Sequence, residues 1–182
     1  SNTILDLEID SRGDIWLATA NGISKYSNSK FKNFTRNDGL PAKLITTVHI
    51  DKNDENIVWF GSENSGLTCY RDNKFVTYSM KDGLPSNTIR DIIQFNEGEI
   101  FIACYNSGLS KFNGQTFELF DKGLDDKRVV KLEIGWDNKI WLATESAGIG
   151  IFENDIFTMV KDSDGLAHNE MFTLYFDGVR MW

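Results

Sequence analysis

The strongest constraint on the fold is a pattern of about 42 residues that recurs along the chain. Asp-Gly-Leu occurs at 38–40, 82–84 and 164–166, and the variant Lys-Gly-Leu occurs at 122–124. The glycines of these turns lie at positions 39, 83, 123 and 165, so they are 44, 40 and 42 residues apart. Such a period indicates one supersecondary unit that is used several times, with neighbouring units packed against each other.

Three further features recur in a fixed order within each unit. An aromatic side chain sits in an apolar segment, a glycine–aliphatic pair follows it six or seven residues later, and two spaced apolar residues close the unit. The aromatic residues are Trp16, Trp59, Phe101, Trp141 and Trp182; the pairs begin at Gly22, Gly66, Gly108 and Gly148; the closing residues are 31/34, 75/78, 117/120 and 157/160. Because these marks agree in order and spacing, they define the repeat.

Each unit contains four short apolar segments that are separated by turns. In the first unit these are residues 4–9, 15–19, 23–26 and 31–35, and their β-branched and aromatic content is typical of strands joined by hairpins. Four strands in such a unit are the signature of a β-propeller blade. No segment has helical periodicity, so we expect no helix.

We therefore predict an all-β propeller fragment of four complete four-stranded antiparallel blades plus the start of a fifth. It forms a single domain over residues 1–182, with repeat units 1–41, 42–85, 86–124, 125–166 and the partial unit 167–182. The five recurring aromatic rings are expected to pack between neighbouring sheets.

Turns and cysteines receive structural interpretations. In Asp-Gly-Leu, glycine allows a positive φ, aspartate can bond the backbone downstream of it, and leucine anchors the loop in the core.

Cys69 and Cys104 lack the spacing of a metal site, so free thiols are expected, with a disulfide as the alternative.

Composition excludes several classes of function. The net charge is −8 and no cluster of Lys and Arg is present, which argues against binding to nucleic acid or to an anionic membrane. No apolar run is long enough to span a membrane, so no direct membrane insertion by this segment is expected.

The repeat resembles the two-component regulator propeller family. Residues 82–89 match the family's Asp-Gly-Leu-Pro-Ser-Asn turn and the strand after it, and residues 15–19 and 140–144 match its central strand. Departures are Phe101 in place of Trp, Cys104 in place of Thr, the turn at 121–123 and two extra residues near 53–56. The resemblance implies the periplasmic sensor domain of a hybrid histidine kinase/response regulator of Bacteroidetes-like bacteria, many of which detect oligosaccharides.

The two ends of the sequence raise separate expectations. Ser1 and Asn2 align with Ser86 and Asn87, so they are either a native repeat start or the remnant of a tag. Trp182 falls in the second strand expected for unit five. We expect a slice of a longer, seven-bladed array, or two copies that complete each other, since open edges invite association. Self-association as a dimer is therefore predicted.

No catalytic or metal-binding signature is found. The chain has two histidines: His49 is expected to be structural, and His168 lies in a loop where it could face a binding surface. The acidic residues 51–55 lack the glycine and distal glutamate of a calcium loop. We expect no cofactor and no catalytic activity in this segment.

Candidate ligand-binding residues lie where the loops after second strands meet the connections between units. These loops contain amides, carboxylates, hydroxyls and one aromatic ring, which are the groups that sugars require. The candidates are Asn21, Glu63, Asn64, Arg90, Tyr105, Asn106, Arg128, Glu145 and His168.

Two other functions stay open beside an oligosaccharide sensor. One is an enzyme of the propeller lyase or hydrolase type, since streptogramin lyases use seven-bladed rings with repeats of similar length. The other is a scaffold for protein interactions.

Overall fold

The structure is a computed structural model that describes residues 3–96 and 98–182, so Ser1 and Asn2 lie outside the described residues. Four antiparallel sheets, each of four strands in sequential order, confirm the predicted blades. Blade 1 contains β1 (Ile4–Ile9), β2 (Ile15–Thr19), β3 (Gly22–Ser27) and β4 (Lys30–Phe34); blade 2 contains β5 (Ile45–Ile50), β6 (Val58–Ser62), β7 (Leu67–Arg71) and β8 (Lys74–Tyr78); blade 3 contains β9 (Ile89–Phe95), β10 (Glu99–Cys104), β11 (Gly108–Phe112) and β12 (Phe117–Phe120); blade 4 contains β13 (Val129–Ile134), β14 (Ile140–Thr144), β15 (Ile149–Glu153) and β16 (Ile156–Val160).

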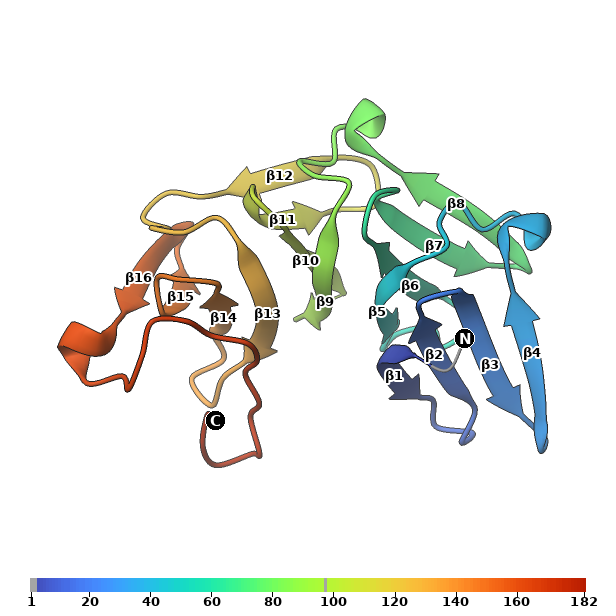
Figure 1. The fold of residues 1–182 in the computed structure, drawn as a ribbon, viewed down its shortest axis with the longest axis horizontal. Helices are drawn as coiled ribbons and strands as arrows, with labels where there is room; N and C mark the ends of the chain where they lie inside the picture. The colour runs from blue at the N-terminus through green and yellow to red at the C-terminus, as the bar shows by residue number, and fades with distance from the viewer. Residues whose placement is uncertain (1–2, 97) are drawn as a thin grey trace.

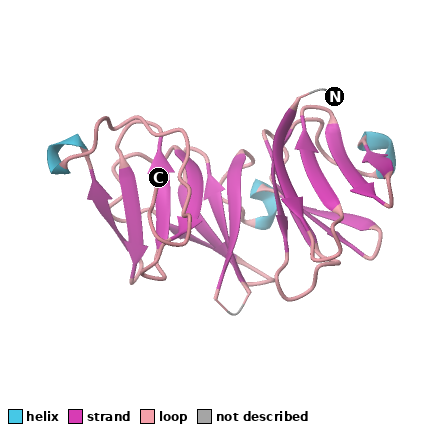
Figure 2. Ribbon diagram, turned by 90° about the horizontal axis from the view of Figure 1, so that it is seen from below, coloured by secondary structure: helices cyan, strands magenta, loops and turns pink. Residues whose placement is uncertain are grey.

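The blades are arranged as an arc (Figure 1). The first strand of each blade (β1, β5, β9 and β13) lies on the concave side, and consecutive first strands contact each other. Seen from below, the sheets stand side by side and each turns one face toward its neighbour (Figure 2). The single domain over residues 1–182 and the boundaries of its repeat units stay predictions.

Aromatic side chains of the second strands fill the interfaces between blades. Trp16, Trp59 and Phe101 are only 3%, 8% and 4% exposed. Trp16 packs against Phe60 and Tyr70 of the next blade, with ring centroids 5.8 and 5.4 Å apart. Removal of so much apolar surface from water is the main force that holds neighbouring sheets together.

The last two recurring rings do not follow this expectation fully. Trp141 is half-buried and Trp182 is 64% exposed. The prediction that all five rings pack between sheets is therefore wrong for Trp182, which no sheet of the described residues covers.

The segment after Gly165 begins a fifth blade. Leu174, in this segment, is buried against blade 4, and the Gly148 N–H donates to the Asn169 carbonyl at 2.8 Å, as Gly66 N–H does to Asn87. A single bridge joins Phe176 to Met181, and no extended strand forms among these residues. Of the predicted second strand in which Trp182 falls, the structure shows this bridge and two backbone hydrogen bonds between Tyr175 and Trp182.

The Asp-Gly-Leu turns are structural, but two details differ from expectation. Single turns of 3₁₀ helix precede the glycines at Arg36–Asp38, Met80–Asp82 and Asp162–Asp164, although no helix was expected. The aspartate accepts from the backbone upstream rather than downstream, as in the 2.9 Å bond from Ser79 N–H to Asp82, because this closes a capping box. Gly83 then takes φ +91° and Leu84 is buried.

A chain of polar side chains runs across the first strands at one equivalent position of each blade. Thr47 Oγ1 lies 2.9 Å from a carboxylate oxygen of Asp6 and 3.3 Å from one of Asp91, and Lys131 Nζ lies 2.9 Å from Asp91. Acceptors thus alternate with donors from blade 1 to blade 4. Asp6 and Asp91 also accept backbone N–H groups of the following blade, so each carboxylate links two sheets.

Thr47→Val tests this polar chain because it removes the hydroxyl and preserves the shape. The single hydroxyl hydrogen that Asp6 and Asp91 share is lost, which should lower the free energy of unfolding by about 1–3 kcal/mol in urea denaturation. Thr158→Val makes the same change at an exposed position of β16 and should alter stability by less than about 0.5 kcal/mol. Equal effects of the two substitutions would contradict a stabilising role for the chain.

Candidate functional site

The loops between second and third strands and the connections between blades lie at the same end of the fold, because antiparallel pairing places the start of each first strand beside the end of the second. Five of the nine predicted residues meet there in a continuous network across blades 2, 3 and 4. We call it the loop network; its members are Glu63, Arg90, Tyr105, Asp126, Arg128, Glu145 and Ser146.

The part of the loop network between blades 2 and 3 combines an ion pair with ring stacking. Arg90 Nη1 lies 2.8 Å from a carboxylate oxygen of Glu63, and the guanidinium carbon lies 4.6 Å from the centre of the Tyr105 ring. Both charged side chains are about one-third exposed, so a ligand could reach them. Thr88 supports this arrangement by donating its hydroxyl to the Glu63 carbonyl.

The part between blades 3 and 4 is centred on one carboxylate. Glu145 Oε2 accepts from the Tyr105 hydroxyl at 2.7 Å and pairs with Arg128 Nη1 at 3.1 Å. The hydrogen bond to Glu145 raises the pKa of Tyr105, so this hydroxyl stays protonated and donates at neutral pH.

Asp126 holds the side chain of Arg128 in place through hydrogen bonds. Its carboxylate accepts from Arg128 Nε and Nη2, both at 2.9 Å, and from the backbone N–H and hydroxyl of Ser146. Burial by itself raises the pKa of Asp126, but the bonds from Arg128 and Ser146 outweigh it, and the pKa is lowered. A bidentate pair of this kind fixes the guanidinium plane, which leaves Nη1 directed at Glu145.

The other four predicted residues are outside the loop network. Asn64 and Asn106 are exposed at the tips of the same loops, beside Glu63 and Tyr105. Asn21 is exposed in blade 1, where it lines a separate pocket of about 280 Å³ with Lys43. His168 is exposed in the fifth unit, and its Nδ1 accepts from the Glu170 N–H at 3.0 Å.

The two histidines have different surroundings. His49 is buried in β5, and its Nδ1 lies 3.0 Å from Glu8 of blade 1, as expected of a structural side chain. Among the described residues no group of three His, Cys, Asp or Glu side chains could hold a metal ion. Cys69 and Cys104 are free and buried; burial raises their pKa to about 11 and about 12, so they are thiols rather than thiolates.

Sequence reasoning missed Asp126. The repeat contains a signal for it, because Asp126 occupies the position of Ser86, and each of the two residues binds the backbone N–H of the residue two positions later. Ser86 accepts from the Thr88 N–H and Asp126 from the Arg128 N–H, at 3.1 and 3.0 Å, so the alignment of units shows the same turn twice.

The sequence matches no protein-family model and no curated protein. Solved structures do match. The extracellular domain of BT3049 from B. thetaiotaomicron, assigned to a hybrid two component system, superposes with a TM-score of 0.82 over 96% of this chain at 16% identity. The chain has the β-propeller fold. It spans 26% of the length of that neighbour.

Other propellers of different function also match. Virginiamycin B lyase from Staphylococcus aureus has a TM-score of 0.72 and 17% identity over 87% of this chain and 55% of its own. PorZ, a surface component of the type-IX secretion system of Porphyromonas gingivalis, has a TM-score of 0.70 and 15% identity over 94% and 29%. At these identities the likeness shows the fold alone.

No described helix is long and apolar enough to cross a membrane.

The lowered pKa of Asp126 makes the loop network sensitive to acid. Its contribution to stability is complete above the ordinary aspartate pKa of 3.8 and is lost as the pH falls through the lower pKa of the folded state. Asp126→Asn should therefore reduce the free energy of unfolding more at pH 6 than at pH 2.5, as measured by urea denaturation at each pH. A reduction of equal size at both pH values would show that ionised Asp126 contributes nothing.

Proposed function

We propose that this chain is a ligand-binding sensor module in the extracytoplasmic, periplasmic part of a two-component regulator, and that it senses an oligosaccharide at the loop network. The loop network is the observation that carries the proposal. The similarity to the extracellular domain of BT3049 supports the sensor part, since that domain is assigned to a hybrid two component system.

The chemistry of the loop network suits a sugar. Glu63 and Glu145 offer carboxylate oxygens to hydroxyl groups, while Arg90 and Arg128 offer N–H donors. Both arginines are partly exposed, and both are held by partners that fix their orientation. Binding to groups that are already ordered costs less conformational entropy, which favours affinity for a polar ligand.

A lyase or hydrolase has less support. A histidine-to-alanine variant of the Staphylococcus aureus lyase is described as catalytically inactive. In this chain, His49 is buried and bonded to Glu8, and exposed His168 lies in a different unit. Neither of these histidines contacts the loop network.

Screening the purified protein against an array of oligosaccharides tests the proposal. The affinity of the protein for a glycan that binds, measured by calorimetry, should then fall about tenfold when Tyr105→Ala removes the ring or when Arg90→Gln removes the charge. Tyr26→Ala, at the opposite end of blade 1, should leave the affinity unchanged. Absence of any glycan hit, or equal losses in all three variants, would overturn the oligosaccharide assignment.

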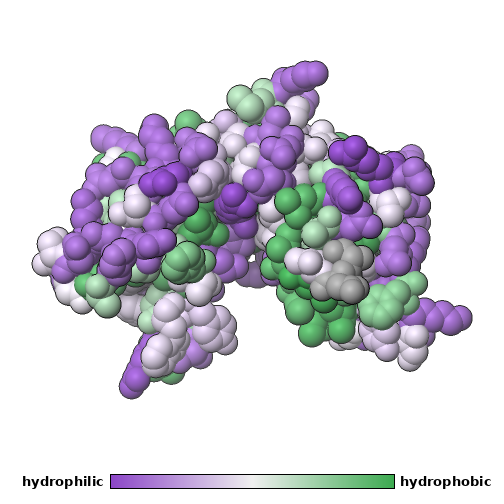
Figure 3. All heavy atoms as spheres, viewed as in Figure 1, coloured by the Kyte–Doolittle hydropathy of each residue, from purple (hydrophilic) through white to green (hydrophobic). Residues whose placement is uncertain are grey.

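Self-association is a further part of the proposal, with a second copy as the partner. Leu7 is 50% exposed, whereas the equivalent Val48, Ile92 and Leu132 are buried by the preceding blade. The apolar surface over β1 is visible as the large green area in Figure 3. Another blade would cover this surface in the way that blades 1, 2 and 3 cover their neighbours.

Multi-angle light scattering over a range of concentrations tests this association. The wild type should approach the mass of a dimer, and Leu7→Glu should remain a monomer because it places a charge in the contact. Val76→Glu, an exposed position on β8, should behave as the wild type does. A wild-type monomer at every concentration would refute the dimer.

A further inference from the structure

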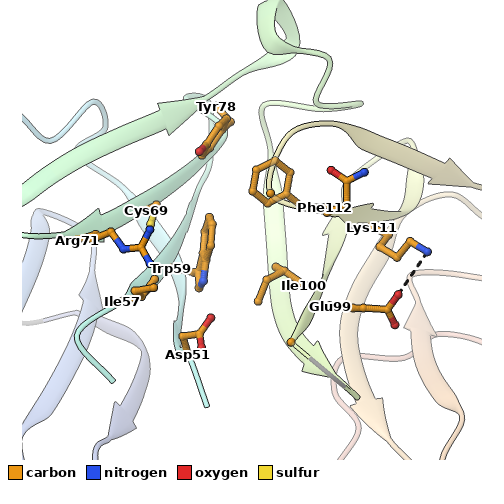
Figure 4. A pocket seen from close by; sticks show the side chains of 13 residues that line it. Asp51, Ile57, Trp59, Cys69, Arg71, Tyr78, Glu99, Ile100, Lys111 and Phe112 are labelled. Carbon is orange, nitrogen blue, oxygen red and sulfur yellow. Dashed lines mark ion pairs between the residues drawn. The ribbon is translucent and has the colours of Figure 1, made fainter. Parts of the chain in front are cut away.

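A cleft of about 420 Å³ opens between blades 2 and 3, at the end of the sheets opposite to the loop network. Figure 4 shows Trp59, Arg71 and Asp51 on the wall that blade 2 provides, with Ile100 and Phe112 facing them from blade 3. The volume falls within the range of small-molecule sites, and the walls combine aromatic, aliphatic and charged groups.

Blade 2 differs from the other blades at one position of this wall. The residue paired with the second-strand aromatic is Lys25 in blade 1, Lys111 in blade 3 and Ile151 in blade 4, but Cys69 in blade 2. In blade 1 the lysine ammonium lies 4.9 Å above the Trp16 ring. The short thiol of Cys69 cannot cover Trp59 in this way.

The indole N–H of Trp59 is a buried donor without a partner among the described residues. Trp59 is only 8% exposed, and it lines the cleft. In the two last units the equivalent indole donates to an aspartate, from Trp141 to Asp137 at 3.1 Å and from Trp182 to Asp177 at 2.8 Å. An unpaired buried donor is costly, so an acceptor from outside the protein is expected beside Trp59.

Asp51, which directly follows β5, uses one of its two carboxylate oxygens to hold a turn. Oδ1 of Asp51 accepts the backbone N–H groups of Asn53 and Asp54, at 2.9 and 3.1 Å, within the turn that is two residues longer in this unit. Its second oxygen has no hydrogen bond to a described residue, and the side chain lines the cleft. Asp51 is therefore available to a cationic group.

Arg71 supplies the opposite charge. Its side chain is exposed and lines the same cleft. Arginine binds carboxylates through two parallel N–H bonds, and the Trp59 N–H adds a third donor on the same wall. The blade 2 wall thus offers donors for an anion at Arg71 and Trp59 and an acceptor for a cation at Asp51.

We propose that this cleft binds a free α-amino acid with an apolar side chain. Its carboxylate takes the donors of Arg71 and Trp59, and its ammonium binds the free oxygen of Asp51. The apolar side chain packs against Ile57, Ile100 and Phe112, which carry no charge to oppose it. The site lies apart from the loop network, so it does not depend on the function proposed there.

Calorimetric titration of the purified protein with L-leucine and L-phenylalanine tests this site. We expect saturable one-to-one binding of at least one of the two. 4-Methylpentanoate, which is leucine without the ammonium, and isoamylamine, which is leucine without the carboxylate, should each bind at least about tenfold more weakly than leucine, since each loses a charged hydrogen bond. Equal binding of 4-methylpentanoate would refute the role of Asp51.

Three variants locate the site without unfolding the chain. Trp59→Phe retains an aromatic ring, Asp51→Asn retains the Oδ1 acceptor of the turn, and Arg71→Gln changes an exposed residue. Each variant should bind the amino acid about tenfold more weakly than the wild type, at an unchanged melting temperature. The matched control is Trp16→Phe, which removes the other unpaired buried indole N–H, in the cleft between blades 1 and 2. The proposal would be overturned if neither amino acid gave heat of binding, which would mean that the cleft holds only water. It would also be overturned if Trp16→Phe and Trp59→Phe lost affinity for the amino acid equally.

Discussion

Coverage of both faces of each four-stranded sheet is the constraint on which the rest of the structure depends. A sheet with two apolar faces is stable only between two neighbours, and here one aromatic ring of the second strand closes each contact. Where a neighbouring blade is present, at Trp16, Trp59 and Phe101, the ring is buried, and where none is present, at Trp182, it is exposed. The arc, the loop network and the clefts between blades all follow from this face-to-face stacking.

The same repeat that builds the core also distributes the polar groups. Positions that are equivalent in the repeat differ in chemistry: Cys69 stands where blades 1 and 3 have lysine, and Thr47 stands where Asp6 and Asp91 have carboxylates. The backbone therefore supplies a regular frame, and departures from the consensus create the individual features. This is why the two ends of the fold have unrelated chemistry, an ion-pair network at one end and an open cleft at the other.

Much of the fold could be predicted because the period and the side-chain alternation are local signals. The strands of unit one were placed within one residue of the observed bounds, and the loops that carry Glu63, Tyr105 and Glu145 were placed at one end. The contacts that assemble the loop network could not be predicted, because they join residues of different blades, as the bond between Tyr105 and Glu145 does. The cleft at Trp59 was missed for a related reason, since an unpaired indole N–H is a property of packing and leaves no mark in composition.

The alternation of donors and acceptors along Asp6, Thr47, Asp91 and Lys131 limits how such an array can change its length. Loss of blade 2 alone would bring Asp6 against Asp91, two carboxylates in a region with little water, and one of them would have to take up a proton. Loss of blades 2 and 3 together would bring Asp6 against Lys131 and restore a matched pair. Loss of blade 2 alone therefore carries an electrostatic penalty that loss of blades 2 and 3 together avoids.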